Sequence, residues 1–274
     1  MTSGNGVRLR TAGGPIGAGL RRYWYPLAAL VRRDLKKRYA TSMLGIGWTI
    51  LHPAILMALY TVVFGFIFRS GRPAEGAREF VLYLLSGMLP YISIAEAVHA
   101  SVASLREDRA LLERETFPAE VVPAARVLTA SVGEAVGLLL VVLLAPFFGL
   151  SPTPWILALP LLILVRVLLT LGLAWAVSVL SIFVSDLTQV LSLLLTSWLF
   201  LTPIFYTADA APPILGRLMV LNPLHAIVRA YRSVLIEGQA PWSAGLVAIV
   251  WATLFAGVGL WFFRKTLDRA KDFL

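Results

Sequence analysis

The stretch that decides the fold is MLGIGWTILHPAILMALYTVVFGFIF at residues 43–68, which follows the basic segment RRDLKKRYATS at residues 32–42. No Lys, Arg, Asp or Glu interrupts residues 43–68, and the stretch exceeds the ~20 residues that an α-helix needs to cross a bilayer. Further apolar stretches are Phe80–Leu105, Val127–Leu150, Trp155–Val184, Val190–Tyr206 and Trp242–Phe263. In lipid, the backbone polar groups of a spanning segment must be satisfied inside a helix. We therefore expect an all-α integral membrane protein with six transmembrane helices.

The composition indicates one membrane domain. Of the 274 residues, 58% are hydrophobic and 14% are charged, whereas soluble domains carry about 25% charged residues. Cysteine is absent, which excludes disulfides and thiolate metal sites, and we expect no metal ion. We predict a disordered tail at 1–20, an amphipathic interfacial helix at 21–42 and the transmembrane domain at 43–274. The tail has no apolar core, which argues against a cleaved signal peptide.

Basic residues predict how the helices are oriented. With six spans, both termini lie on the same side of the membrane. Of the 24 Lys and Arg residues, 17 fall on that side and six on the other, with Arg166 left inside the fourth span. Basic residues accumulate on the cytoplasmic side, so we expect cytoplasmic termini. The net charge of +9 is thus an orientation and lipid-surface signal, and we expect no nucleic-acid partner.

The segment at residues 23–39, YWYPLAALVRRDLKKRY, combines an apolar face with a basic one. Its apolar residues recur at helical spacing, while Arg32, Arg33, Lys36 and Lys37 occupy the other side. Such a helix lies in the membrane interface, where anionic lipid attracts each basic residue by about 1 kcal/mol. The segment is therefore either a membrane anchor or a cytoplasmic gate or docking surface.

The sizeable inner loop between spans is REDRALLERETFPAE at residues 106–120. It carries five acidic and three basic residues around the apolar pair Leu111 and Leu112. Phe117–Pro118 ends its short helix, because the residue before proline disfavours helical geometry. A charged helix with an apolar knob suits docking into a groove on a soluble partner. The alternative is an ordinary solvated turn.

Five segments, in this order along the chain, resemble one family. They are Arg32–Phe64, Leu111–Leu128, Leu171–Val190, Trp198–Tyr206 and Leu221–Gly238. Together they resemble the permease subunit of polysaccharide-exporting ABC transporters, the type-2 permeases for O-antigen, capsule and teichoic-acid polymers. The resemblance runs from about residue 32 to the C-terminus and specifies the family rather than the polymer.

The resemblance implies a homodimer of six-span subunits bound to two copies of a separate ATPase subunit in a bacterial inner membrane. It also implies a gate helix at Trp24–Tyr39, a coupling helix on the ATPase at Arg106–Pro118, and re-entrant helices at Pro212–Glu237. The gate-helix residues are Trp24, Tyr25, Arg32, Arg33, Lys36 and Lys37. The coupling residues are Arg109, Leu111, Leu112, Glu113, Glu115 and Phe117. His225 and Arg229 depart from the family, whose members often have other polar residues there.

The chain lacks the motif that would bind ATP. Its four lysines are Lys36, Lys37, Lys265 and Lys271, and none follows a glycine as in GxxxxGK[ST]. We therefore expect no cofactor in this chain, and ATP with magnesium in the partner ATPase. Residues 207–241 are too long for a turn. Their apolar faces break at Asn222–Pro223, which predicts two half-inserted helices.

Polar residues inside spans are rare and usually face the bundle interior or water. The candidates here are Glu96, His99, Glu134 and Arg166. We interpret them mainly as structural pairs between helices, and the spacing of Glu96 and His99 would let these two hydrogen-bond. Gly133 and Gly137 form a small-xxx-small pattern that allows close helix packing.

Aromatic residues crowd the first and fifth spans. Interfacial belts explain many of them, but some lie within the spans, where aromatic faces can stack on sugar rings. The candidate channel residues are Trp48, Tyr60, Phe64, Trp198 and Tyr206.

The leading hypothesis is export of a lipid-linked polysaccharide, with no catalysis in this chain. A first alternative is a type-2 permease for a small molecule, a lipid or teichoic acid. A second is an intramembrane enzyme acting on lipid-linked sugars. Its expected mark is a polar cluster at one membrane face, and the sequence shows none. The three histidines also fit neither an acyltransferase box nor a zinc-binding helix.

Overall fold

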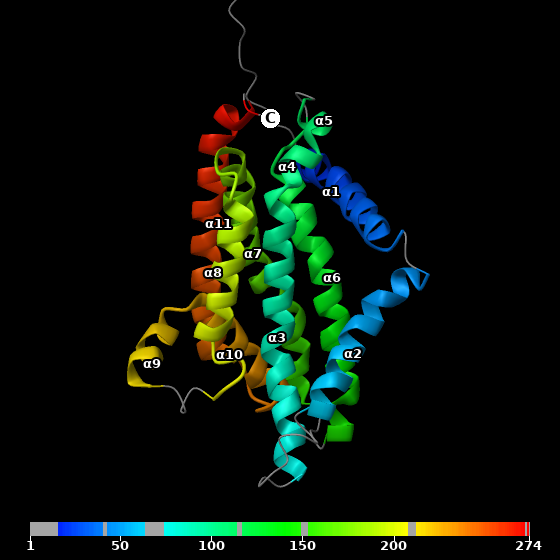
Figure 1. The fold of residues 1–274 in the computed structure, drawn as a ribbon, viewed down its shortest axis with the longest axis vertical. Helices are drawn as coiled ribbons and strands as arrows, with labels where there is room; N and C mark the ends of the chain where they lie inside the picture. Colours follow the sequence, from blue (N-terminus) through cyan, green and yellow to red (C-terminus); the bar gives the residue numbers. More distant parts are fainter. Residues whose placement is uncertain are drawn as a thin grey trace, which may run out of the picture.

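The computed structural model describes residues 16–40, 43–63, 74–113, 117–148, 153–207, 212–271 and 273. Within these residues, the regular elements are helices, and most of them form an upright bundle (Figure 1). The helices are α1 (Ile16–Tyr39), α2 (Trp48–Val62), α3 (Ala74–Val102), α4 (Ser104–Glu107), α5 (Arg109–Leu112), α6 (Val121–Leu144), α7 (Leu159–Phe183), α8 (Leu187–Leu201), α9 (Pro213–Val220), α10 (Pro223–Leu235) and α11 (Trp242–Lys271). Short 3₁₀ turns occupy Gly45–Gly47, Ala145–Phe148 and Pro154–Ala158.

Four of the described helices, α3, α6, α7 and α11, are long and apolar enough to cross a membrane. The first and fifth expected spans instead contain α2 and α8, which have 15 residues each. A 15-residue helix is about 22 Å long, whereas the hydrocarbon core is about 30 Å thick. Length and composition therefore support four of the six expected spans.

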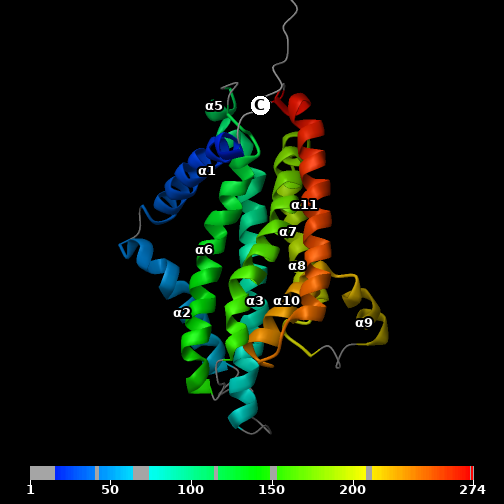
Figure 2. The ribbon, with the colours of Figure 1, turned by 180° about the vertical axis from the view of Figure 1, so that it is seen from behind.

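The bundle is built around α3, which packs against α6, α7, α8 and α10 (Figures 1 and 2). In the most apolar 18-residue stretch of α3, 78% is buried in protein, whereas the corresponding buried share in α11 is 22%. Helix α11 packs along α7 and leaves the apolar residues of its other face exposed. We therefore expect lipid or another chain to cover this face. The order of burial thus places α3 at the centre and α11 at the edge.

The contact of α7 with α11 depends on glycine. A Cβ atom on Gly259 would lie 2.1 Å from the carbonyl oxygen of Gly172, and one on Gly172 would lie 2.1 Å from that of Phe255. Any larger residue at either position would collide with backbone, so the two helices cross at the closest distance that small residues permit. Of the two glycines expected to allow close packing on α6, only Gly137 lies at a close contact, since a Cβ there would lie 2.6 Å from Leu89. Gly133 faces open space.

The segment after α8 folds into two helices, as its apolar faces predicted. Asn222 caps α10, because its side-chain oxygen accepts hydrogen bonds from the backbone N–H groups of Leu224 at 3.0 Å and His225 at 3.4 Å. Pro223 follows at the first helical position, where its missing N–H costs nothing. Helix α10 then packs against α3, α7 and α11, while α9 extends away from the bundle (Figure 1).

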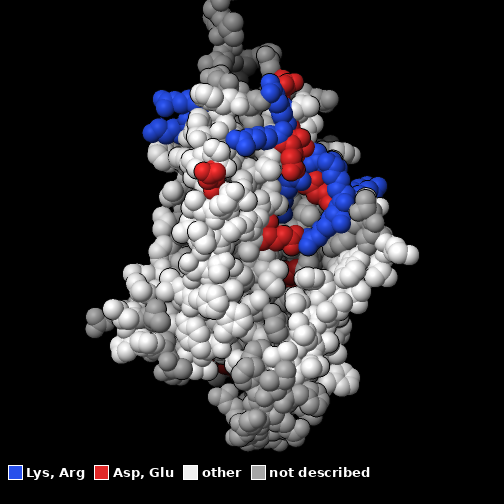
Figure 3. All heavy atoms as spheres, in the orientation of Figure 1, with Lys and Arg blue, Asp and Glu red and all other residues white. Residues whose placement is uncertain are grey.

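Helix α1 runs obliquely along the outside of the bundle and contacts α6 (Figure 2). It begins at Ile16, earlier than the expected start at residue 21, and residues 1–15 lie outside the described part. Figure 3 shows Lys, Arg, Asp and Glu gathered around the upper end of the molecule and along α1. We call the end that holds α4, α5 and the last turns of α11 the charged end, and the opposite end, near α10, the far end.

Candidate functional site

A network of ion pairs at the charged end joins α1 to the loop that carries α4 and α5. Arg33 on α1 donates to Asp108 with a distance of 2.8 Å from Nη2 to Oδ2, and its Nε donates to Asp34 at 3.0 Å. Asp34 and Asp108 are both buried, at 7% and 6% exposure. Hydrogen bonding to Asp108, followed by that to Asp34, raises the pKa of Arg33. The guanidinium therefore stays charged and holds the two carboxylates together.

Arg126, at the start of α6, completes this network. Its guanidinium lies 2.6 Å from Asp34, 2.9 Å from Glu107 and 3.1 Å from Asp108. Three helical segments that are distant in sequence are thus tied at one place. Because each buried carboxylate has two cationic partners, no single arginine carries the whole network. We call Arg33, Asp34, Glu107, Asp108 and Arg126 the charged-end network.

The loop is also fixed to the other side of the bundle. Arg106 donates to the backbone oxygen of Ser181 on α7 at 2.7 Å. Trp175 donates to the backbone oxygen of Glu120 at 3.0 Å, and the carboxylate of Glu120 accepts from Arg264 on α11 at 3.1 Å. A displacement of the loop would therefore act on α1, α6, α7 and α11 together.

The expected coupling residues divide into an outer and an inner set. Arg109 and Glu113 are exposed and form an ion pair at 3.2 Å. Leu112 is buried, and Leu111 and Phe117 pack half-buried against the same apolar cluster. The apolar pair thus anchors the loop rather than standing out as a knob, and Glu115 lies outside the described residues.

The expected gate residues on α1 lie mostly on its surface. Trp24 and Tyr25 are 64% and 78% exposed. Arg32, Lys36 and Lys37 are exposed as well, whereas Arg33 is half-buried in the charged-end network. The sequence pattern groups these four basic residues on one face, but only Arg33 is partly buried in the protein.

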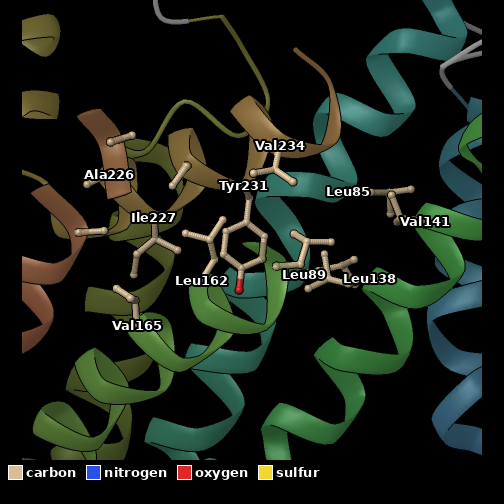
Figure 4. Packing of buried hydrophobic residues seen from close by; sticks show 14 of the residues in the cluster. Leu85, Leu89, Leu138, Val141, Leu162, Val165, Ala226, Ile227, Tyr231 and Val234 are labelled. Atoms are coloured by element: carbon tan, nitrogen blue, oxygen red, sulfur yellow. The ribbon is translucent and has the colours of Figure 1, made fainter. Parts of the chain in front are cut away.

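A second group of charges lies deep in the bundle. Arg166 on α7 is fully buried and pairs with the carboxylate of Glu134 on α6, which is 3% exposed. The hydroxyl of Tyr231 on α10 donates to the other oxygen of Glu134 at 2.8 Å. Figure 4 shows Tyr231 projecting from α10 among Leu89, Leu138 and Leu162. We call Glu134, Arg166 and Tyr231 the buried triad, and it links two spans to the far-end helix.

The remaining polar pair that we considered, Glu96 and His99, does not form. Glu96 accepts from Arg38 at the end of α1, with 3.0 Å between Nη2 and Oε2. Within the described residues, no hydrogen bond joins Glu96 to His99, which lies half-buried on α3. The reason is that Arg38 reaches the carboxylate from outside the bundle. Glu96 is thereby a second attachment point for α1.

The candidate channel aromatics occupy separate places in the subunit. Trp48, 37% exposed on α2, lines a cavity of about 60 Å³ together with Glu96 and Glu134. Trp198 on α8 donates to the Asn222 side chain at 2.7 Å, and Tyr206 donates to the backbone oxygen of Phe200 at 2.8 Å. Helices α2 and α8 lie apart (Figure 1). The side chain of Tyr60 and all of Phe64 lie outside the described part.

Buried polar side chains fasten the far end through bonds that the sequence did not predict. Buried Arg232 on α10 donates to the backbone oxygen of Pro203 at 2.8 Å and stacks over the ring of Tyr83 at 3.4 Å. Asn222 donates to the hydroxyl of Thr202 at 2.8 Å while it caps α10. The Asn-Pro pair is a recognisable cap signal. Arg232 has no such signal, because its partners, backbone carbonyls and the ring of Tyr83, lie far from it in the chain.

His225 and Arg229, the two departures from the family pattern, lie on α10. Arg229 is exposed, and His225 is half-buried beside it. Burial, together with the nearby charges of Arg229 and Arg232, lowers the pKa of His225 to about 4. The imidazole is therefore neutral near pH 7.

Comparison with known proteins supports a transport role for this architecture. The chain is 30% identical over 225 residues to the O-antigen export system permease protein RfbA of Myxococcus xanthus, with 81% of this chain and 85% of that protein covered. It is 24% identical over 249 residues to RfbA of Klebsiella pneumoniae, with 90% and 94% covered. The polysialic acid transport protein KpsM of Escherichia coli is 23% identical over 244 residues, with 86% and 92% covered.

The chain also matches a whole protein family. Residues 25–236 match the family described as ABC-2 type transporter, so the matched region reaches from α1 to the end of α10. It includes both the charged-end network and the buried triad. The resemblance expected from five sequence segments is thereby confirmed, and this chain belongs to the ABC-2 type transporter family.

Proposed function

We propose that this chain is the membrane subunit of an ABC transporter that exports a lipid-linked polysaccharide of the O-antigen or capsule type across a bacterial inner membrane. The observation that carries the proposal is the near full-length similarity to permeases named for O-antigen export and polysialic acid transport. A small-molecule or lipid permease would share the helices but has no such support among these relatives.

In this proposal, two copies of a separate ATPase subunit bind ATP and magnesium and supply the energy. The chain's own contribution is mechanical. An ATPase that presses on the exposed pair Arg109 and Glu113 would move a loop that is bonded to α1, α6, α7 and α11. A rigid attachment of this kind transmits a displacement instead of absorbing it.

The charged end faces the cytoplasm in this arrangement, and six segments cross the membrane. The proposal counts α2 and α8 as the two additional spans. Each is shorter than the hydrocarbon core, and flanking residues or local thinning of the bilayer accommodate such a mismatch. The basic residues of α1 and of the last turns of α11 then meet the anionic cytoplasmic leaflet.

A polymer needs a path, and we place that path between two copies of the chain. In a homodimer, α2 of one copy could approach α8 of the other, although the two helices lie apart within one subunit. Trp48, Tyr60, Phe64, Trp198 and Tyr206 are the proposed sugar contacts. Aromatic faces suit a sliding polymer because they offer contact area without a fixed hydrogen-bond pattern.

The experiment that tests this function measures ATP hydrolysis by the chain purified with its co-expressed ATPase in lipid nanodiscs. A lipid-linked glycan should stimulate hydrolysis several-fold, while the bare lipid carrier and the free glycan should not. Equal stimulation by the bare carrier would favour a lipid permease. Release of glycan from its lipid without the ATPase would favour the intramembrane enzyme.

A further inference from the structure

A groove of about 900 Å³ lies alongside α1, between this helix and α6. Its α1 wall carries Trp24, Ala28, Val31 and Leu35, which recur every three to four residues and therefore share one helix face. Leu128 of α6 lines the opposite wall. The groove lies below the charged-end network, where α1 separates from the bundle.

Two cations border this apolar surface. Arg32 and Lys36 line the groove and are exposed, and within the described residues neither has a hydrogen bond or an ion pair. Their neighbours differ, since Arg33 pairs with Asp108 and Arg38 with Glu96. Like charges four residues apart repel each other on a helix. An anion between Arg32 and Lys36 would relieve that repulsion.

We propose that this groove binds one anionic phospholipid of the cytoplasmic leaflet. An acyl chain would lie along Trp24, Val31 and Leu35, and the phosphate would sit between Arg32 and Lys36. The charge pattern selects this occupant: a soluble anion would leave the apolar wall in water, and a neutral lipid would leave the two cations unpaired. The inference rests on the membrane location of the chain and not on which polymer it transports.

A lipid in this position has a mechanical role. Helix α1 is fixed to the protein by ion pairs of Arg33, Asp34 and Arg38. Of the residues that line the groove, Arg32 and Lys36 have no ion pair within the described residues. The bound lipid fills the space under α1 and sets its tilt relative to α6. Helix α1 is then held both by its ion pairs and by the lipid.

The first test counts lipids retained by the full-length chain in native mass spectrometry, with phosphatidylglycerol or phosphatidylcholine added. Wild-type chain should retain one phosphatidylglycerol and little phosphatidylcholine. The double variant Arg32→Gln/Lys36→Gln should bind phosphatidylglycerol roughly 30-fold more weakly, because each lost cation contributes about 1 kcal/mol. The control Arg22→Gln/Lys37→Gln removes the same charge from exposed positions outside the groove and should change binding by about twofold or less.

A second test blocks the groove and leaves every charge in place. Ala28 lines the groove and Ala29 does not, although both are exposed. Ala28→Trp should reduce phosphatidylglycerol retention about tenfold or more, while Ala29→Trp should retain it like wild type. This pair separates a defined site from general attraction to a basic surface.

Three results would overturn the proposal. Equal weakening by the two charge-matched double variants would mean that surface charge alone attracts the lipid. Equal retention by Ala28→Trp and Ala29→Trp would mean that the groove is not used. Displacement of phosphatidylglycerol by equimolar polyprenyl diphosphate would assign the groove to the lipid end of a transported substrate instead.

Discussion

The charged-end network and the buried triad both join helices through arginine and carboxylate, but their surroundings differ. In the network, Arg126 faces three carboxylates and Arg33 faces two, at the surface end of the bundle. In the triad, the fully buried Arg166 meets Glu134, and its Nε and Nη1 atoms have no hydrogen-bond partner within the described residues. The network is redundant and partly exposed, whereas the triad depends on one carboxylate.

The difference indicates two kinds of task. A redundant network keeps its helices joined when one ion pair is lost, so it can carry a displacement that acts on the loop. A buried ion pair cannot lose a partner in this way, because a charge left alone in the interior is costly. The triad therefore fixes α6, α7 and α10 relative to one another, whereas the network ties α1 and the loop that carries α4 and α5 to α6 through several partners.

The largest expected effect comes from breaking the triad. Replacing Glu134 with leucine leaves Arg166 charged and unpaired, which should destabilise the fold by about 3–5 kcal/mol. Unfolding in detergent, followed by tryptophan fluorescence, measures this loss. The double variant Glu134→Leu/Arg166→Leu should recover most of the stability. Equal stability of the single and double variants would contradict the role of the pair.

An intermediate effect is expected at the centre of the network. Arg126→Gln should cost about 2 kcal/mol, less than the triad variant, since Arg33 still pairs with both Asp34 and Asp108. Its distinctive result should be functional: basal ATP hydrolysis by the complex is retained, and stimulation by lipid-linked glycan falls. If stability falls as much as in Glu134→Leu, the two groups do not differ in the way described.

Tyr231→Phe should have a smaller effect on stability than either of these. It removes one hydrogen bond to Glu134 and keeps the ring, so a loss of about 1–2 kcal/mol is expected. Thermal unfolding of the purified chain measures it. Tyr91→Phe is a matched control, because the Tyr91 hydroxyl donates to an uncharged partner, the backbone oxygen of Leu195. A loss no larger than that of the control would show that Tyr231 adds little to the triad.

The smallest effect on stability is expected at the exposed edge of the coupling loop. Glu113→Lys should leave the unfolding temperature unchanged, because the ion pair with Arg109 is exposed and such pairs contribute little. It should slow binding of the ATPase at low salt, and high salt should reduce the difference from wild type because it screens the exposed charges. Co-purification at low and high ionic strength provides the measurement. Unchanged binding at both would remove Glu113 from the interface.

The sequence predicted the helices well where periodicity and length carry the information. The apolar stretches gave the long spans, and Asn222–Pro223 gave the break between α9 and α10. Arg166 and Glu134 were recognised as intramembrane charges, since a charge within a span needs a partner. Their pairing, and the part played by Tyr231, could not be read from the sequence, because the three residues come from helices far apart in the chain.

Other features escaped prediction for a similar reason. The small-xxx-small pattern drew attention to Gly133 and Gly137, but the closest crossing joins Gly172 and Gly259. No local pattern reveals that pair, because the two glycines lie on different helices. Asp34 and Asp108 lie within a basic and a mixed segment of the sequence, where no pattern singles them out. Their burial follows from the position of Arg126, which a linear pattern does not encode.

The measurement that tests export most directly follows the glycan itself. Proteoliposomes would contain the chain and its ATPase, with the ATPase outside and lipid-linked glycan in the outer leaflet. We predict that ATP moves glycan into the lumen, where an added glycosidase no longer cleaves it, and that Arg126→Gln reduces this protection. Glycan that stays fully cleavable with ATP, or becomes equally protected without ATP, would contradict the assignment of this chain as a polysaccharide export permease.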